Sequence, residues 1–289
     1  MIGLLYRKRI EYQPLIDTFD KELKSLARFN QFCCRDKSHK NILAFSGGKD
    51  SVCAYYLAVK SGIEFTPIYS RTSADPPELL YFIDEFNLWA ERNNYPEVIK
   101  QKYNKFTDRQ LGGSMAGKEK TMWSLIGNRA MPPTRRVPYC CGELKERTGE
   151  PGDIVFTGVR WEESKCRAEQ KMVNFYNKKT MVRAIVDWTK DEVWSIILSN
   201  DIPYCILYDM GWDRIGCLGC PKAQTSNRIR ELTLYPAYKE LYIRSFDKML
   251  EYRKNHDLDT KWSSGEEVLN WWLYQGAKNN VLENQCSMF

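Results

Sequence analysis

The stretch NILAFSGGKDS, residues 41–51, decides the fold of this chain. Its apolar part, residues 41–45, has the length of a buried β-strand. The pair Gly47-Gly48 cannot easily continue a strand, because paired glycines favour a tight turn that leaves backbone N–H groups uncovered. Lys49 adds a positive charge, and residues 51–58 have the pattern of a helix start. A strand, a glycine turn and a helix N-terminus that meet in this way form an anion site, and phosphate is its natural ligand.

The sequence SGGKDS, residues 46–51, resembles the PP-loop of the adenine nucleotide alpha-hydrolase superfamily, whose members split ATP between the α and β phosphates. It is not the G-x-x-x-x-G-K-[ST] P-loop, because the spacing from glycine to lysine is too short. The resemblance implies that all six residues bind ATP: Ser46, Gly47, Gly48, Lys49, Asp50 and Ser51. Asp50 would either help to place Mg²⁺ or cap the helix. The competing interpretation is an ordinary strand-to-helix turn with two glycines and a surface lysine.

Strand and helix patterns alternate along the chain after this turn. A helix is predicted at residues 77–93, and a capping box at residues 189–192 predicts the start of another. The further strands are predicted at residues 65–69, 97–102, 153–157 and 181–186. This alternation predicts an α/β fold with a Rossmann-like, doubly wound parallel sheet, whose ligands bind at the carboxyl ends of the strands.

Two polar segments are expected on that same edge of the sheet. Arg71 begins the loop that follows the strand at residues 65–69, while Gly158 and Arg160 follow the strand at residues 153–157. An arginine directly after the carboxyl end of a strand is well placed to bind a phosphate, because its guanidinium makes paired hydrogen bonds to oxyanions.

The chain divides into three segments by composition and pattern. They are an N-terminal helical segment at residues 1–40, a nucleotide-binding domain at residues 41–222 and a C-terminal helical region at residues 223–289. Helical spacing of apolar residues predicts an amphipathic helix over residues 14–32. In the tail, helices are predicted to start at Pro236 and near residues 263–267. Trp271 and Trp272 are expected to pack against the main domain, with stacking on nucleic-acid bases as the alternative.

Composition sets broad limits on the kind of protein. The apolar share of 43% over 289 residues supports a sizeable core rather than a disordered chain. The net charge of +6 and the pI near 8.7 are compatible with a nucleotide or nucleic-acid partner but diagnose neither. The opening residues, MIGLLYRKRIEYQ, are too briefly apolar for a signal peptide, and no apolar run is long enough to cross a membrane. We therefore expect a cytoplasmic protein without a membrane partner.

Ten cysteines in a reducing compartment are not expected to form disulfides, so their clustering needs another explanation. Cys140-Cys141 and Cys217-x-x-Cys220 could complete a tetrahedral zinc site or hold a [4Fe–4S] cluster. Adjacent cysteines favour the cluster, because their Cβ atoms diverge and a cubane spreads its irons over a larger volume. Reduced cysteines that only pack are the third alternative. Cys33 and Cys34 are expected to be packing residues, since no CxxC lies near them in sequence.

The order of four motifs resembles the phosphoadenosine phosphosulfate (PAPS) reductase family. These motifs are Cys140-Cys141, the TGVRWEES stretch at residues 157–164, the VDWTKDEVW stretch at residues 186–194 and GCLGCP at residues 216–221. The resemblance implies a [4Fe–4S] cluster on Cys140, Cys141, Cys217 and Cys220, as in the adenylyl-sulfate-using branch of that family. It also implies that Arg71, Gly158 and Arg160 border the nucleotide.

Two departures from that family shape the functional hypothesis. True sulfonucleotide reductases have a degraded PP-loop, whereas residues 46–51 are intact here. The reductases also carry a nucleophilic cysteine in a Glu-Cys-Gly-x-His motif, whereas this sequence ends ENQCSMF, with Cys286. An intact PP-loop together with four such cysteines resembles the ATP pyrophosphatases of DNA phosphorothioation, the DndC/SspD kind, and some tRNA-thiolating enzymes.

The hypothesis is therefore an ATP pyrophosphatase that adenylates an acceptor for sulfur transfer to nucleic acid. Its catalytic residues would be Lys49, Asp50 and Arg160, and its sulfur would come from a partner such as a cysteine desulfurase. Three alternatives remain at this point. A sulfonucleotide reductase could use Cys286 as a mobile thiol, an adenylyltransferase of the FAD-synthase kind would not need the cysteines, and a nucleotide sensor would bind ATP without cleaving it.

Overall fold

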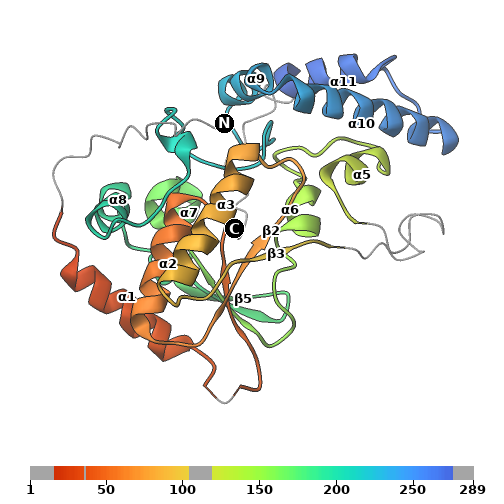
Figure 1. Ribbon diagram of the computed structural model, residues 1–289. Helices are drawn as coiled ribbons and strands as arrows, with labels where there is room; N and C mark the ends of the chain where they lie inside the picture. Colours follow the sequence, from red (N-terminus) through yellow and green to blue (C-terminus); the bar gives the residue numbers. More distant parts are fainter. Residues whose placement is uncertain (1–15, 36, 104–118, 276–289) are drawn as a thin grey trace.

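A six-stranded sheet organises the computed structural model, which describes residues 16–35, 37–103 and 119–275 (Figure 1). The strands are β1 (Asn41–Ala44), β2 (Thr66–Ser70), β3 (Ile99–Gln101), β4 (Ile154–Thr157), β5 (Val173–Tyr176) and β6 (Lys179–Val182). Their order is β3-β2-β1-β4-β6-β5, and every neighbouring pair is parallel except β5 and β6. The predicted Rossmann-like α/β sheet is confirmed, with one antiparallel strand added at its edge.

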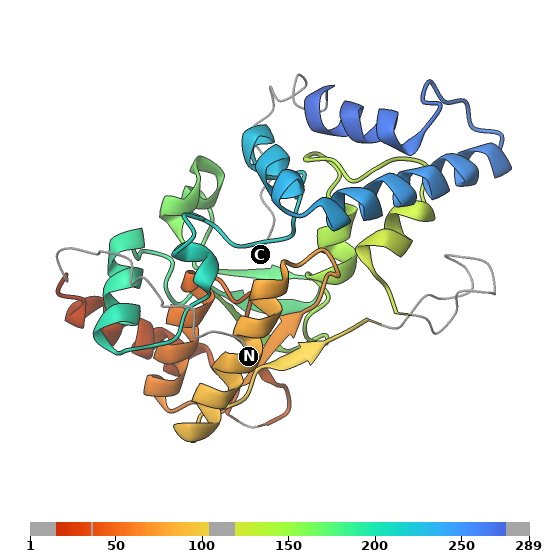
Figure 2. The same ribbon diagram turned by 45° about the horizontal axis from the view of Figure 1, so that its top comes forward.

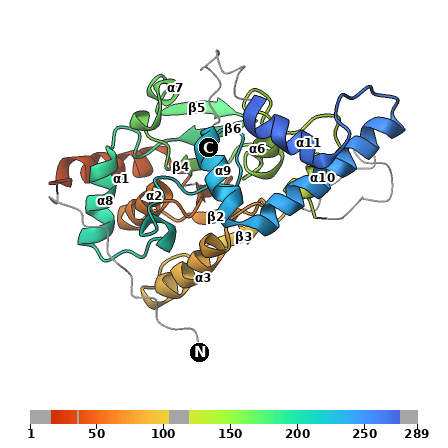
Figure 3. The same ribbon diagram turned by 90° about the horizontal axis from the view of Figure 1, so that it is seen from above.

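Helices connect the strands and extend the molecule at one end. They are α1 (Phe19–Phe32), α2 (Lys49–Ser61), α3 (Pro77–Arg92), α5 (Met122–Gly127), α6 (Tyr139–Leu144), α7 (Lys165–Ala168), α8 (Lys190–Ser199), α9 (Thr225–Leu234), α10 (Pro236–Asn255) and α11 (Gly265–Asn270). Helix α10 contacts α5, α9 and α11, and Figure 2 shows these four helices gathered at one end. Figure 3 shows α1 and α8 at the opposite end. No helix in the described part of the chain has the length and apolar character needed to span a bilayer.

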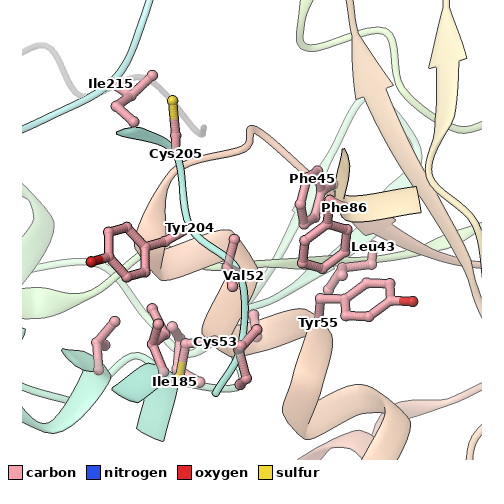
Figure 4. Close-up of a cluster of buried hydrophobic side chains, with 14 of the residues drawn as sticks. Leu43, Phe45, Val52, Cys53, Tyr55, Phe86, Ile185, Tyr204, Cys205 and Ile215 are labelled. Carbon is pink, nitrogen blue, oxygen red and sulfur yellow. The ribbon is translucent and has the colours of Figure 1, made fainter. Parts of the chain in front are cut away.

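Aromatic packing fixes the base of the turn that follows β1. The ring of Phe45 lies 4.9 Å from that of Phe86 on α3 and 5.9 Å from that of Tyr55 on α2. The rings of Tyr55 and Phe86 are themselves 4.9 Å apart, in an edge-to-face arrangement (Figure 4). Because these buried rings join β1, α2 and α3, the chain has little freedom where it leaves the strand.

The β5–β6 hairpin corrects one prediction. A strand was expected at residues 181–186, but β6 begins at Lys179 and ends at Val182. Asn177 and Lys178 both adopt positive φ angles, 48° and 61°, which is the conformation of a tight hairpin turn. This turn sets the register between β5 and β6, so β6 starts before residue 181. After β6, the N–H of Val186 donates to the carbonyl of Arg183, so residues 183–186 form a turn rather than a strand.

Other predicted elements agree with the structure within a few residues. The capping box before α8 is present, because Thr189 Oγ1 accepts the N–H of Glu192 and the Glu192 carboxylate accepts the N–H of Thr189. Helix α10 begins at Pro236 and α11 at Gly265, as expected. Trp272 is 2% exposed, its ring packs 4.8 Å from that of Tyr242 on α10, and its indole N–H donates to the carbonyl of Pro133 at 2.6 Å, so this tryptophan is a packing residue.

Helix α1 is held on the sheet domain by a buried polar cluster. It begins at Phe19, later than the sequence pattern indicated, and Pro14 lies outside the described residues. The Arg28 guanidinium makes paired hydrogen bonds of 2.6 and 3.0 Å to the Asp187 carboxylate. Ser25 Oγ donates to the carbonyl of Ala184 at 3.0 Å and accepts the indole N–H of Trp188 at 2.9 Å. Helix α1 therefore packs as part of the same core.

Replacing Arg28 with alanine should lower the free energy of unfolding by about 2 kcal/mol, because a partly buried carboxylate loses its paired donor. Burial raises the pKa of Asp187, but the hydrogen bond and charge of Arg28 outweigh it and leave the pKa lowered. The contribution of this pair is therefore complete above the unfolded pKa of Asp187 and is lost as pH falls through the lower folded value. Urea denaturation at neutral and acidic pH measures both effects.

The matched control is Arg244→Ala, which removes an exposed ion pair with Glu240 and should change stability by less than about 1 kcal/mol. A difference between wild type and Arg28→Ala that does not shrink at acidic pH would contradict the role given to Asp187.

Candidate nucleotide and cysteine sites

The turn at residues 46–51 leads from β1 into the N-terminus of α2. Gly47 has a φ of +73°, a backbone conformation that strains any residue with a side chain, and a Cβ there would also force Leu79 Cδ1, 2.3 Å away, to shift. Gly48 is the N-cap residue of α2. Ser51 Oγ accepts the N–H of Ser46 at 3.2 Å and donates to the carbonyl of Gly48 at 2.8 Å, which closes the turn on itself.

The three residues predicted to be catalytic meet at the head of α2. The carboxylate of Asp50 lies 3.2 Å from Lys49 Nζ through one oxygen and accepts Arg160 Nε at 2.7 Å through the other. Lys49 is 6% exposed and Arg160 is 3% exposed. Burial alone would lower the pKa of Arg160, but Asp50 and Glu162 raise it above its ordinary value. Lys49 and Arg160 are therefore both buried beside a turn suited to an anion.

Gly158 explains how Arg160 reaches this point. A Cβ on Gly158 would lie 2.7 Å from the backbone carbonyl atoms of Asp50 and 2.9 Å from the amide nitrogen of Ser51. The segment after β4 can pass this close to α2 only without a side chain at position 158. Arg160 is held further by hydrogen bonds from its Nη1 atom to Glu162 at 2.7 Å and to the carbonyl of Trp188 at 3.1 Å.

Tyr208 also contacts the turn, although no motif in the sequence singles it out. Its hydroxyl accepts the N–H of Lys49 at 2.8 Å, and its ring packs edge-on against Trp194 at 5.0 Å. Burial raises the pKa of Tyr208, and the charge of Asp50 raises it further. Tyr208 is 157 residues or more away from the turn in sequence, so only the tertiary structure brings the two together.

Arg71 directly follows β2 and begins the loop that leads to Ala74. Its Nε atom is buried and has no hydrogen-bond partner within the described ranges. In the loop that follows, Thr72 Oγ1 accepts the Cys217 thiol at 3.3 Å, and the carbonyl of Ala74 accepts the N–H of Leu218 at 2.8 Å. The loop after β2 therefore supports the turn that contains Cys217 and Cys220, at the same edge of the sheet as residues 46–51.

The structure brings the four predicted cysteine ligands into one cluster. Cys140 and Cys217 are buried, Cys141 and Cys220 are half-buried, and none of the four is in a disulfide. A hydrogen bond with Cys141, burial and the charges of the other three thiols raise the pKa of Cys140. The same hydrogen bond and the charges of nearby lysines lower the pKa of Cys141, and burial raises that of Cys217.

The four thiols do not converge on one point. Across residues 16–35, 37–103 and 119–275, no three His, Cys, Asp or Glu side chains are arranged to bind a single metal ion. A [4Fe–4S] cubane does not require such convergence, because each thiolate binds a different iron. The assignment of Cys140, Cys141, Cys217 and Cys220 as cluster ligands remains a prediction.

Lys145, one turn after Cys141, is a second residue that the sequence analysis missed. Burial would lower the pKa of its ammonium, but Cys217, Asp75, Cys141 and Cys220 together raise it. A cation close to three of the four thiols fits a group of negative charge, as a thiolate-bound cluster would be. The signal in the sequence was its position four residues after Cys141, which makes it the C-cap residue of α6.

The remaining cysteines differ from one another. Cys33 packs against the core around α1 and α2, and its thiol donates to the carbonyl of Asn30 at 3.4 Å, as expected of a packing residue. Cys53 and Cys205 are buried in the same core (Figure 4). Cys166 is disulfide-bonded, so the expectation that the cysteines stay unpaired is wrong at this position. Cys286 lies outside the described residues.

Comparison with known proteins finds both uncharacterized relatives and relatives named as reductases. An uncharacterized protein of Methanocaldococcus jannaschii is 26% identical over 275 residues, which cover 89% of this chain and 60% of that protein. An adenosine 5'-phosphosulfate reductase of Staphylococcus epidermidis is 38% identical over 151 residues, covering 49% of this chain and 56% of the reductase. The chain therefore spans little more than half the length of these curated relatives.

A PAPS reductase from Candida auris is a similar solved structure, with a TM-score of 0.45 and 15% identity over 68% of this chain and 89% of the other. The model of the phosphoadenosine phosphosulfate reductase domain family matches residues 40–223, which include both the turn and all four clustered cysteines. This chain therefore belongs to the phosphoadenosine phosphosulfate reductase domain family.

Proposed function

We propose that this chain is an ATP pyrophosphatase that adenylates an acceptor for sulfur transfer to nucleic acid. The observation that carries the proposal is the intact turn at residues 46–51, at whose helix end Lys49 and Arg160 share the Asp50 carboxylate. A helix N-terminus with two buried cations suits a polyphosphate. The +6 net charge is compatible with a nucleic-acid acceptor.

In this proposal the turn binds the β and γ phosphates of ATP. An oxygen of the acceptor attacks the α-phosphorus, the bond from that phosphorus to the β-bridging oxygen breaks, and pyrophosphate leaves with the electron pair. Lys49 and Arg160 stabilise the negative charge that develops on the phosphate oxygens. Asp50 keeps both cations oriented before the nucleotide arrives, and its carboxylate is suited to help place Mg²⁺. A partner protein, such as a cysteine desulfurase, then supplies the sulfur that displaces AMP.

The cysteine site would hold a [4Fe–4S] cluster through Cys140, Cys141, Cys217 and Cys220. When bound, such a cluster supplies a redox-active group with exchangeable sulfur. The chain's own contribution is positioning and charge balance. Thr72 holds the Cys217 thiol, and the Lys145 ammonium offsets negative charge on the thiolates.

A sulfonucleotide reductase is the second candidate. The relative from Staphylococcus epidermidis, named as an adenosine 5'-phosphosulfate reductase, is 38% identical over about half of this chain. In that case the turn at residues 46–51 would bind a sulfonucleotide, and a thiol donor would release sulfite from it. The two candidates share the fold and the cysteines, and they differ in which bond of the nucleotide is broken.

Replacing Lys49 with alanine should reduce pyrophosphate release from ATP by about 100-fold or more, because one of two cations at the phosphates is lost. The assay measures pyrophosphate with ATP and Mg²⁺, and sulfite from adenylyl sulfate and PAPS in parallel. Lys60→Ala, at the more exposed far end of α2, is the control and should keep wild-type activity. Sulfite release without pyrophosphate release would favour the reductase over the pyrophosphatase.

Anaerobically purified protein should be brown and contain about four irons per chain, with broad visible absorption from sulfur-to-iron charge transfer. Cys217→Ser should remove most of the iron and the colour, because this buried thiol is one of four proposed ligands. Cys33→Ser, which changes a packing cysteine at the end of α1, should leave both unchanged. Stoichiometric zinc in place of iron would overturn the assignment of the cluster.

A further inference from the structure

The turn that contains Cys217 and Cys220 is held by side chains from the C-terminal helices. Tyr242 on α10 donates its hydroxyl to the carbonyl of Leu218 at 2.8 Å. Glu231 on α9 accepts the N–H of Gly219 at 2.7 Å, and Arg228 Nε donates to the carbonyl of Gly219 at 3.3 Å. All of these partners lie beyond residue 223, where the match to the family domain ends. The backbone between the two cysteines therefore depends on helices outside that match.

Arg228 links this turn to the helix with the other two cysteines. Its Nη1 atom donates to the carbonyl of Trp272 at 3.0 Å, and its guanidinium lies 4.0 Å from the centre of the Trp272 ring. The indole N–H of Trp272 in turn donates to the carbonyl of Pro133 at 2.6 Å. Pro133 lies in the segment that runs into α6, where Cys140 and Cys141 are found. Arg228 and Trp272 thus tie the two cysteine-bearing segments together.

The guanidinium of Arg228 is buried, and one of its donors is unsatisfied. The residue is only 5% exposed, and its Nη2 atom is buried without a hydrogen-bond partner in the part of the chain that the structure describes. The hydrogen bond from Nε to the carbonyl of Gly219 places the guanidinium next to the residue that precedes Cys220. Burial lowers the pKa of Arg228, and nearby Tyr242 and Cys220 act to raise it. Native proteins rarely leave such a donor unsatisfied, so this one calls for a reason.

We propose that Arg228 is a positioning residue for the four-cysteine site, which fixes the 217–220 turn against α6 and raises the reduction potential of a [4Fe–4S] cluster bound there. The inference rests on the cluster assigned under the proposed function. Reduction adds one negative charge to a cluster that already carries four thiolates. A buried cation beside Cys220 therefore stabilises the reduced form more than the oxidised form.

The test is a redox titration of the full chain, reconstituted anaerobically and followed by absorbance and by electron paramagnetic resonance. Arg228→Gln removes the charge and should shift the reduction potential to a more negative value. Arg228→Lys keeps the charge but loses the paired donors, so its potential should stay near that of wild type while its iron is lost faster. Arg230→Gln, an exposed neighbour on α9 that lies over Trp212, is the matched control and should change neither property.

Several outcomes would overturn the inference. These are a wild-type protein that takes up no [4Fe–4S] cluster, an Arg228→Gln variant with wild-type potential and full iron, and an Arg228→Lys variant shifted as far as Arg228→Gln. If Arg228→Gln holds no cluster, the iron content of Arg228→Lys decides the question. Iron retained by Arg228→Lys supports a role for the positive charge, and iron lost from both variants contradicts that role. Pyrophosphate release, measured on the same wild-type samples, tests the proposed function separately, because the titration does not require ATP.

Discussion

The carboxylate of Asp50, shared between Lys49 and Arg160, is the interaction on which the turn at residues 46–51 depends. Two cations buried side by side would repel each other and lose their hydration, and one carboxylate between them offsets both costs. The three side chains come from two elements, because Lys49 and Asp50 open α2 while Arg160 follows β4. The ion pairs therefore also hold the end of a central strand against the head of the helix. Gly158 permits this contact, since any Cβ there would meet the backbone of Asp50.

The second site shares the same edge of the sheet but has a different kind of support. The nucleotide turn rests on strands, helices and aromatic rings within the central layer. The cysteines instead lie between the loop after β2, the short helix α6 and the C-terminal helices. Tyr238 on α10 reinforces this, because its hydroxyl donates to the carbonyl of Asp75 in the same loop at 2.8 Å. The loop that follows β2 thus joins the central sheet to the C-terminal helices.

Local sequence signals predicted the elements whose causes are local. The glycine pair before Lys49, the capping box before α8 and Pro236 at the start of α10 each act within a few residues, and each was found. The predicted bounds of β6 were wrong, because the hairpin turn at Asn177 and Lys178 fixes where β6 starts relative to β5. Tyr208 was missed because its hydroxyl reaches the turn only through tertiary packing. The sequence also indicated which four cysteines would meet, but it could not indicate how their thiols are arranged.

The contacts of Gly219 also determine where this chain can be truncated or fused to another protein. Its N–H and C=O groups are bound by Glu231 and Arg228, both outside residues 40–223. A fragment cut to those bounds, or a fusion that joined them to another tail, would leave polar backbone groups bare beside the cysteines. Residues 40–223 and the C-terminal helices that follow them therefore constitute one unit for excision, transplantation or recombination.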